Sequence, residues 1–264
     1  MANLLRPDLL ALSWAMAALL MAALWLVQRA RSDASLVDAG WAAGLGMSAV
    51  LLAVLVEGPL GRRLLVAALA GGWSLRLALH LYLDRVRGKP EDGRYRKLRA
   101  DWGPAAQRNF LLFFQAQALL VAILSVPYIL ALTNPAPSPV AAWIGAGLVV
   151  LSVLGETAAD RTLSAFRADP GHRGLTCREG LWRYSRHPNY FFEWLHWWAW
   201  VALAFGSPLF LLSLGAPALM LFFLFKVTGI PPTEARALET RGEDYRVYQR
   251  TTSVFVPWFP RSEP

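Results

Sequence analysis

Charged residues are scarce in this sequence: they make up 17% of its 264 residues, whereas hydrophobic residues make up 56%. A soluble domain carries roughly a quarter charged residues, so the deficit predicts that much of the surface faces lipid. The basic residues lie in loops between apolar runs, where membrane topology explains them, although the net charge is +8. We therefore expect membrane lipids as partners and no nucleic acid.

Several motifs are missing as well. A single cysteine, Cys177, excludes an internal disulfide framework and a cysteine-based metal cluster. The four histidines are scattered and form no HExxH pattern, so we expect no metal site. The sequence has no Gly-rich dinucleotide fingerprint and no Walker loop, so any nucleotide site differs from those of soluble folds. It also has no GxSxG motif.

The apolar runs predict an all-α fold, a polytopic membrane bundle of about seven transmembrane helices in one integral membrane domain, 1–264. A spanning helix needs about 20 mostly apolar residues. The first run reads as a span and not as a removed signal peptide. The expected spans are 9–28, 36–56, 64–83, 110–132, 139–158, 190–206 and 208–227.

The basic residues predict the orientation of this bundle. With the N-terminus outside, the external segments hold Arg6, Arg62 and Arg63, and Arg76 lies within the third span. The other 22 of the 26 basic residues then fall on the inner side. The positive-inside rule therefore places the C-terminus in the cytoplasm, which requires an odd number of spans. The polar segments 84–109, 159–189 and 228–264 would form a cytoplasmic cofactor site.

Polar residues also occur inside the expected spans, where they are costly and often functional. Trp73, Arg76 and His80 lie on one face of the third span, at positions i, i+3 and i+7. This pattern indicates a functional role; alternatively, the Arg76 side chain extends to the membrane interface. At the start of the second span, Asp38 has either a functional role or completes a capping box with Ser35.

The fifth span ends with Glu156, Asp160 and Arg167 on one helical face, which indicates a solvated helix end or a ligand-facing stripe. In the segment from 181 to 194, Arg186 and His187 stand just before a predicted helix start, where an anionic group would meet free backbone N–H groups. Asn189 and Glu193 then carry a polar stripe into the membrane.

Two further segments add cations and aromatic rings. The loop supplies Asp92, Arg94 and Tyr95, and the tail supplies Tyr245 and Tyr248. Together with Arg186, His187 and Asn189, they would suit a large anionic cofactor with a planar ring.

The run Ser185–Trp194 resembles the membrane steroid 5-alpha-reductase superfamily and looks closest to its bacterial DUF1295 branch. Ser35 to Asp38 with Trp41, and Tyr245 to Trp258, extend this resemblance over most of the chain. It implies a seven-helix oxidoreductase of lipid metabolism in the bacterial inner membrane. Such a protein binds NADPH from the cytoplasm and reduces a carbon–carbon double bond in a lipid or steroid-like enone. No obligate protein partner is expected.

The resemblance also implies roles for individual residues. Asn189 would contact the nicotinamide amide with support from Glu193, while Asp160 and Arg167 would hold the adenine-nucleotide half. The steroid enzymes use a Glu and a Tyr as the acid. Asp38 lies near the position of that Glu, but Trp73 stands at that of the Tyr and cannot supply a proton. Asp38, Arg76 and His80 are therefore the candidate acids.

Two alternatives compete with this interpretation. The Arg186-His187-Pro188 run and the tail also resemble isoprenylcysteine carboxyl methyltransferases, which would make the chain an S-adenosylmethionine-dependent membrane methyltransferase. The other alternative is a non-catalytic lipid-binding membrane protein.

Overall fold

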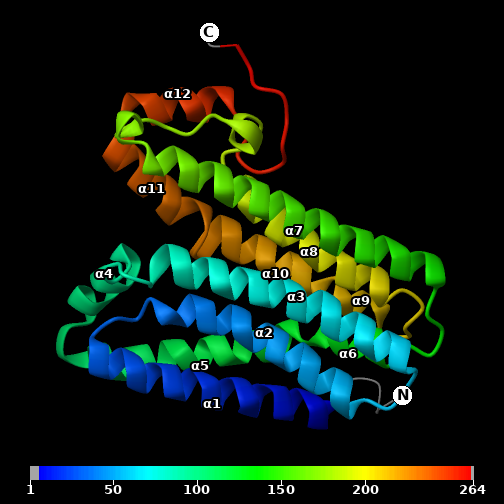
Figure 1. Cartoon of the computed structure of the whole chain (residues 1–264). Helices are drawn as coiled ribbons and strands as arrows, with labels where there is room; N and C mark the ends of the chain where they lie inside the picture. The colour runs from blue at the N-terminus through cyan, green and yellow to red at the C-terminus, as the bar shows by residue number, and fades with distance from the viewer. Residues whose placement is uncertain (1–5, 263–264) are drawn as a thin grey trace. The chain divides into compact units, whose positions relative to one another are not determined.

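Every regular element in the described part of the chain, residues 6–262, is a helix in the computed structural model (Figure 1). This confirms the predicted all-α class. The longer helices are α1 (Pro7–Arg31), α2 (Leu36–Leu55), α3 (Leu60–Arg85), α4 (Gly93–Trp102), α5 (Ala106–Leu124), α7 (Pro139–Ala168), α8 (Pro188–Leu203), α10 (Gly215–Phe222), α11 (Ile230–Arg241) and α12 (Glu243–Thr251). Shorter elements are η1 (Gly103–Ala105), α6 (Val126–Leu132), η2 (Pro170–His172), η3 (Gly180–Arg183), α9 (Phe210–Ser213) and the π-helical η4 (Phe223–Val227).

Six helical segments of the described chain are long and apolar enough to cross a membrane. They are Pro7–Arg31, Leu36–Leu55, Leu60–Arg85, Gly93–Leu132, Pro139–Ala168 and Phe210–Arg241. Six of the seven predicted spans are thereby confirmed in length and composition. The remaining one, 190–206, forms α8, whose 16 residues reach only about 24 Å, against about 30 Å of hydrocarbon. The orientation stays a prediction.

The described helices group into two compact units. Unit 1 runs to Ser138 and also takes Leu203–Ser213, and unit 2 comprises Pro139–Ala202 and the chain from Leu214 onward. The expectation of a single integral membrane domain stays a prediction.

In unit 1, α2 packs along α3, and α1 packs along α5 (Figure 1). Glycine permits the close approach of α2 to α3, because a Cβ at Gly46 would lie 2.7 Å from Ser74 Cβ. The predicted helix 110–132 is broken at Ser125 into α5 and α6. Pro127, which has no N–H to donate, stands in the first turn of α6.

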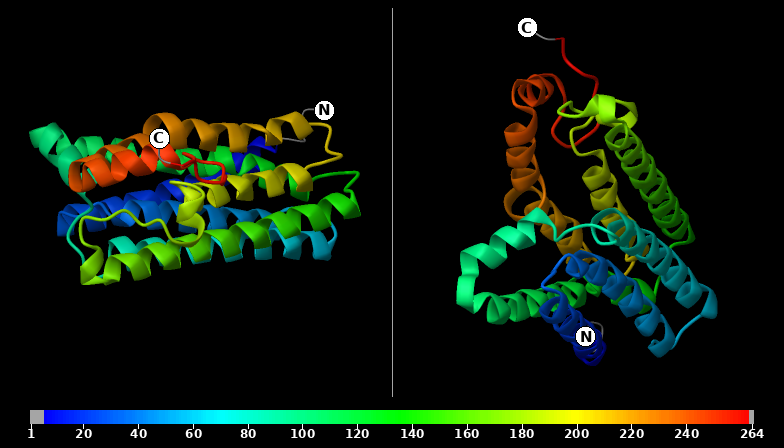
Figure 2. Two further views of the ribbon diagram at one scale, coloured as in Figure 1. Left: turned by 90° about the horizontal axis from the view of Figure 1, so that it is seen from above. Right: turned by 60° about the vertical axis from the view of Figure 1, so that its left-hand side comes forward.

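In unit 2, α8 packs against α7. A Cβ at Gly155 of α7 would lie 2.4 Å from the ring of Phe192 of α8, so only glycine fits there. On the same face of α7, the Ala159 carbonyl accepts a hydrogen bond from Trp182 Nε1 at 2.8 Å. Figure 2 shows the chain after α12, in red, turning back toward the segment that precedes α8. α7 itself continues ten residues beyond the predicted end at 158.

Candidate functional site

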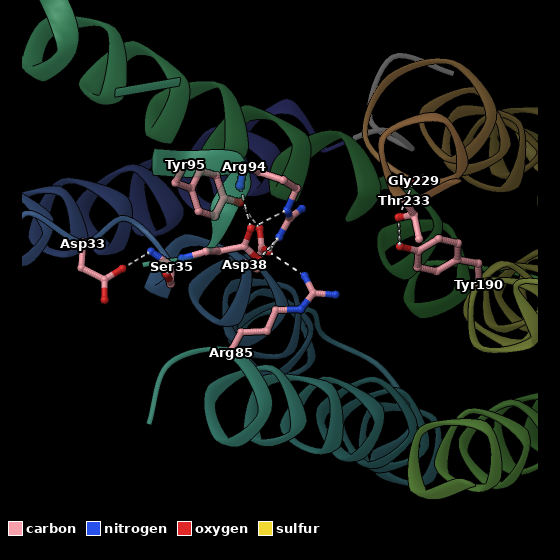
Figure 3. A network of polar contacts seen from close by, with 10 residues as sticks. Asp33, Ser35, Asp38, Arg85, Arg94, Tyr95, Tyr190, Gly229 and Thr233 are labelled. Carbon is pink, nitrogen blue, oxygen red and sulfur yellow. Dashed lines mark hydrogen bonds and ion pairs between the residues drawn. The ribbon is translucent and has the colours of Figure 1, made fainter. Parts of the chain in front are cut away.

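Asp38 lies in the first turn of α2 and accepts hydrogen bonds from three side chains (Figure 3). Tyr95 Oη donates to Oδ1 at 2.5 Å, and Oδ2 lies 2.7 Å from Arg94 Nη2 and 3.0 Å from Arg85 Nη1. Tyr95 is 3% exposed. These contacts fasten the start of α4 and the end of α3 to the start of α2.

The capping box considered for Ser35 and Asp38 is wrong. The Ser35 side chain makes no cap hydrogen bond to α2. Instead, Ser35 Oγ accepts from the backbone N–H of Asp92 at 2.9 Å. Asp92 caps α4, because its Oδ1 accepts from the Arg94 N–H at 2.9 Å.

Asp92 is also paired with the Arg94 side chain at 3.1 Å. Burial raises the pKa of the Asp92 carboxyl, but the hydrogen bonds and charge of Arg94 outweigh it and hold this pKa below its usual value. We call the set Ser35, Asp38, Arg85, Asp92, Arg94 and Tyr95 the α2–α4 clamp.

The clamp contains four of the candidate site residues: Asp38, Asp92, Arg94 and Tyr95. Three donors converge on Asp38, so in this arrangement its carboxylate accepts protons in hydrogen bonds and offers none. That geometry stabilises the fold and suits a proton donor poorly. The other two candidate acids, Arg76 and His80, lie half-buried on α3, where Trp73 is 1% exposed.

In unit 2, Arg186 and His187 hold the tail. Arg186 Nε donates to Glu234 Oε1 at 2.7 Å, and its Nη1 donates to the carbonyls of Gln249 at 2.8 Å and Thr252 at 2.9 Å. His187 Nε2 lies 3.2 Å from the same Glu234 oxygen. Burial lowers the pKa of His187, although the Glu234 hydrogen bond opposes the shift.

Tyr248 and Ser185 complete this attachment of the tail. Tyr248 Oη donates to the carbonyls of Trp182 and Ser185. Ser185 Oγ donates to the Phe255 carbonyl at 2.7 Å. Burial raises the pKa of Tyr248 and of the neighbouring Tyr245. We call the set Ser185, Arg186, His187, Glu234, Tyr248 and Gln249 the tail clasp.

The residues of the tail clasp were expected in part. Tyr248 was a candidate cofactor ligand, as was its neighbour Tyr245 outside the clasp. Arg186 and His187 were also candidate cofactor ligands, and their hydrogen bonds go largely to the tail. Sequence reasoning missed Glu234 as their partner. The available signal was the Pro231-Pro232 pair, which starts α11 and sets Glu234 in its first turns. Beside the clasp, Tyr190 Oη lies 3.4 Å from Thr233 Oγ1 (Figure 3).

The helix pair α7–α8 brings together two more candidates. Asn189 Nδ2 donates to Asp160 Oδ1 at 3.4 Å, and Asn189 Oδ1 accepts from the Tyr190 N–H at 3.0 Å. Asp160 is 8% exposed, and Glu156, one turn along α7, is 2% exposed. Glu193 is half-buried on α8, one turn beyond Asn189. We call Asp160 and Asn189 the acid–amide pair.

The C-terminal end of α7 carries a basic pocket of about 170 Å³, which is lined in part by the exposed Arg167. Arg173 and Arg241 also line it, together with Asp169 and His172. The three guanidinium groups give it an excess of positive charge and suit a phosphate group. Among the described residues, no group of three or more His, Cys, Asp or Glu side chains is placed to hold a metal ion.

Comparison with protein families gives a match over most of the chain. The model of the family described as "Protein of unknown function (DUF1295)" matches residues 24–252. This range contains the α2–α4 clamp, the acid–amide pair and the tail clasp. No curated protein and no solved structure matches the chain.

Proposed function

The chain belongs to the DUF1295 family, which is associated with the steroid 5-alpha-reductase-like superfamily, and on this basis we propose that it is a membrane reductase. The proposed reaction is the NADPH-dependent reduction of a carbon–carbon double bond in a hydrophobic lipid or steroid-like enone. The acid–amide pair is the observation that carries this proposal.

Asn189 is held on both sides of its amide. The Asp160 carboxylate accepts from its Nδ2, and the Tyr190 N–H donates to its Oδ1. These contacts fix which end of the amide presents a donor and which presents an acceptor. A fixed side-chain amide is a suitable partner for the carboxamide of a nicotinamide ring.

The two helices that carry this pair pack closely near it, because Gly155 brings α7 onto the ring of Phe192 of α8. Such packing excludes water, which strengthens the polar interactions made at the site.

The donor set in unit 2 also fits a phosphorylated cofactor. Arg167, Arg173 and Arg241 of the basic pocket would hold a phosphate, and Asn189 with Asp160 would hold the nicotinamide carboxamide. When bound, NADPH would supply the hydride. Arg186 is assigned only a minor role in cofactor binding, because three of its hydrogen bonds are made to residues of the tail.

Asp38, Arg76 and His80 were the candidate acids for the proton that completes the reduction. Asp38 is held as a hydrogen-bond acceptor in the α2–α4 clamp, and an arginine such as Arg76 does not give up its proton in proteins.

The test is ligand-dependent thermal stabilisation of the full chain in detergent, with NADPH and S-adenosylmethionine as separate probes. At a ligand concentration of about 100 times Kd, binding adds roughly 2.7 kcal/mol of stability. We expect this gain with NADPH, its loss in Asn189→Leu, and its reduction in Arg173→Gln. Arg183→Gln is the matched control, since Arg183 is exposed and does not line the basic pocket.

The thermal unfolding midpoint of each variant without ligand shows whether the variant has lost only the binding site or has also lost its folded structure. Stabilisation by S-adenosylmethionine and not by NADPH would show the methyltransferase alternative to be correct. Stabilisation by neither would leave a non-catalytic lipid-binding protein.

A further inference from the structure

A second pocket lies in unit 2, apart from the acid–amide pair and the basic pocket. Its volume is about 540 Å³, and it lies between the end of α12 and the tail that follows. Arg186, Arg250 and Arg261 line it, and none of its described lining residues is acidic. The pocket therefore has a positive lining.

Backbone hydrogen bonds fix the walls of this tail pocket. The Arg261 N–H donates to the Thr251 carbonyl at 2.8 Å, and the Arg186 N–H donates to the Ser253 carbonyl at 2.8 Å. The Trp258 N–H donates to the Tyr184 carbonyl at 2.9 Å. The tail is held at three points, so the pocket is formed before any ligand binds and loses little entropy on binding.

The arginines of the pocket differ in how far their charge is already paired. Arg186 is bound to Glu234, and its side chain is 11% exposed. Arg250 makes a 3.0 Å ion pair with Glu243, in which both side chains are about half exposed or more, at 48% and 64%. Water screens such a pair, so Arg250 keeps most of its attraction for another anion. Arg261 is exposed.

The rim of the same pocket is apolar and exposed. Val256 is 53% exposed, Trp258 69% and Phe259 76%, and all three line the pocket. Large exposed aromatic side chains beside cations are typical of the membrane–water interface, where the rings enter the headgroup region and the cations meet phosphates.

The position of the pocket in the chain agrees with that environment. Arg186 stands two residues before α8, an apolar helix, and α12 begins two residues after the candidate span Phe210–Arg241 ends. The pocket thus lies close in sequence to the polar ends of two apolar helical segments.

We propose that the tail pocket binds the phosphate headgroup of an anionic phospholipid. Arg250 and Arg261 bind the phosphate, while Trp258 and Phe259 contact the glycerol and upper acyl region. A soluble phosphate compound would use the arginines and leave the exposed rings in water, so the apolar rim favours a lipid. The site is independent of the proposed reduction.

The experiment is native mass spectrometry of the detergent-solubilised full chain, titrated with phosphatidylglycerol, with phosphatidylcholine, or with glycerol 3-phosphate. We expect retention of phosphatidylglycerol above phosphatidylcholine and negligible retention of glycerol 3-phosphate. An exposed ion pair between an arginine and a phosphate contributes a factor of up to about five. The double variant Arg250→Gln, Arg261→Gln should therefore weaken phosphatidylglycerol retention by up to roughly 25-fold, and Trp258→Ala should weaken it for both lipids.

Arg246→Gln is the matched control for Arg250→Gln. Arg246 also lies on α12 and also pairs with Glu243, at 3.6 Å, but it does not line the pocket. Trp143→Ala controls for the loss of an exposed tryptophan, since Trp143 is 80% exposed on α7. Both controls should retain the lipid as the wild type does. Equal retention of the two lipids, or full retention by the double arginine variant, would overturn the proposal. Strong retention of glycerol 3-phosphate would show that the site binds soluble phosphate compounds instead.

Discussion

Replacing Asp38 by Asn tests whether the α2–α4 clamp holds the fold or takes part in chemistry. The substitution keeps the shape of the side chain and removes the charge that faces Arg85 and Arg94. Asn offers one acceptor oxygen where the carboxylate has two, and its N–H₂ group faces donors. Both guanidinium groups then lose their shared carboxylate, and Tyr95 competes with them for the remaining oxygen.

The loss of stability expected for Asp38→Asn depends on how deeply its ion pairs are buried. Breaking a fully buried ion pair costs about 3–5 kcal/mol, whereas an exposed pair contributes about 0–1 kcal/mol. The Asp38 side chain is 21% exposed, and those of Arg85 and Arg94 are 31% and 36% exposed. The clamp lies between the two limits, so we expect Asp38→Asn to lower the free energy of unfolding by about 2 kcal/mol.

The assay is unfolding of the full chain in mixed micelles, followed by circular dichroism during a denaturant titration. Asp84→Asn is the matched control: its pair with Lys89 is long, at 3.6 Å, and the Lys89 side chain is 50% exposed. It should cost less than about 0.5 kcal/mol. Unchanged stability of Asp38→Asn, together with loss of turnover, would refute the structural assignment and return Asp38 to the list of candidate acids.

Three further predictions concern unit 2. Gly155→Ala forces a methyl group into the Phe192 ring and should lower the free energy of unfolding by about 1–3 kcal/mol. The control Gly147→Ala has nothing within 4 Å of the added Cβ, so it should leave the free energy of unfolding unchanged or raise it. Arg186→Lys cannot reproduce the hydrogen bonds to Glu234 and the tail carbonyls, so limited proteolysis should cut the tail faster than in the wild type. The pKa of His187 in the folded protein lies below its usual 6.5, so the unfolded chain binds more protons in this range. The free energy of unfolding should therefore decline as the pH falls below about 6.5. His187→Gln should remove this part of the pH dependence, and a wild-type unfolding midpoint that is flat from pH 8 to pH 5 would contradict the prediction.

Local sequence patterns were sufficient to predict six helical segments long and apolar enough to cross a membrane. Apolar runs of spanning length form helices because, in lipid, the backbone N–H and C=O groups must form their hydrogen bonds within each helix. Helical spacing also placed Glu156 and Asp160 on one face of α7, and Pro188 marked the start of α8. These features depend on residues a few positions apart, so periodicity is enough to find them.

The contacts of the candidate site residues could not be read from such patterns. Tyr95 and Asp38 are 57 residues apart in sequence, and Arg186 and Glu234 are 48 apart. Nothing in the local pattern distinguishes an arginine that binds a phosphate from one that binds a glutamate on another helix. The Ser35–Asp38 spacing was misleading for the same reason, because their partners lie on α3, on α4 and in the turn before α4.

The most direct test of the proposed reduction is hydride transfer from labelled cofactor. Full-length protein would be incubated with NADPH deuterated at the transferable position and a hydrophobic enone, and the lipid product analysed by mass spectrometry. We predict a saturated product with one deuterium on carbon for the wild type, and a large loss of that product for Asn189→Leu with the fold intact. Unlabelled product, or undiminished labelling in the Asn189→Leu variant, would contradict it.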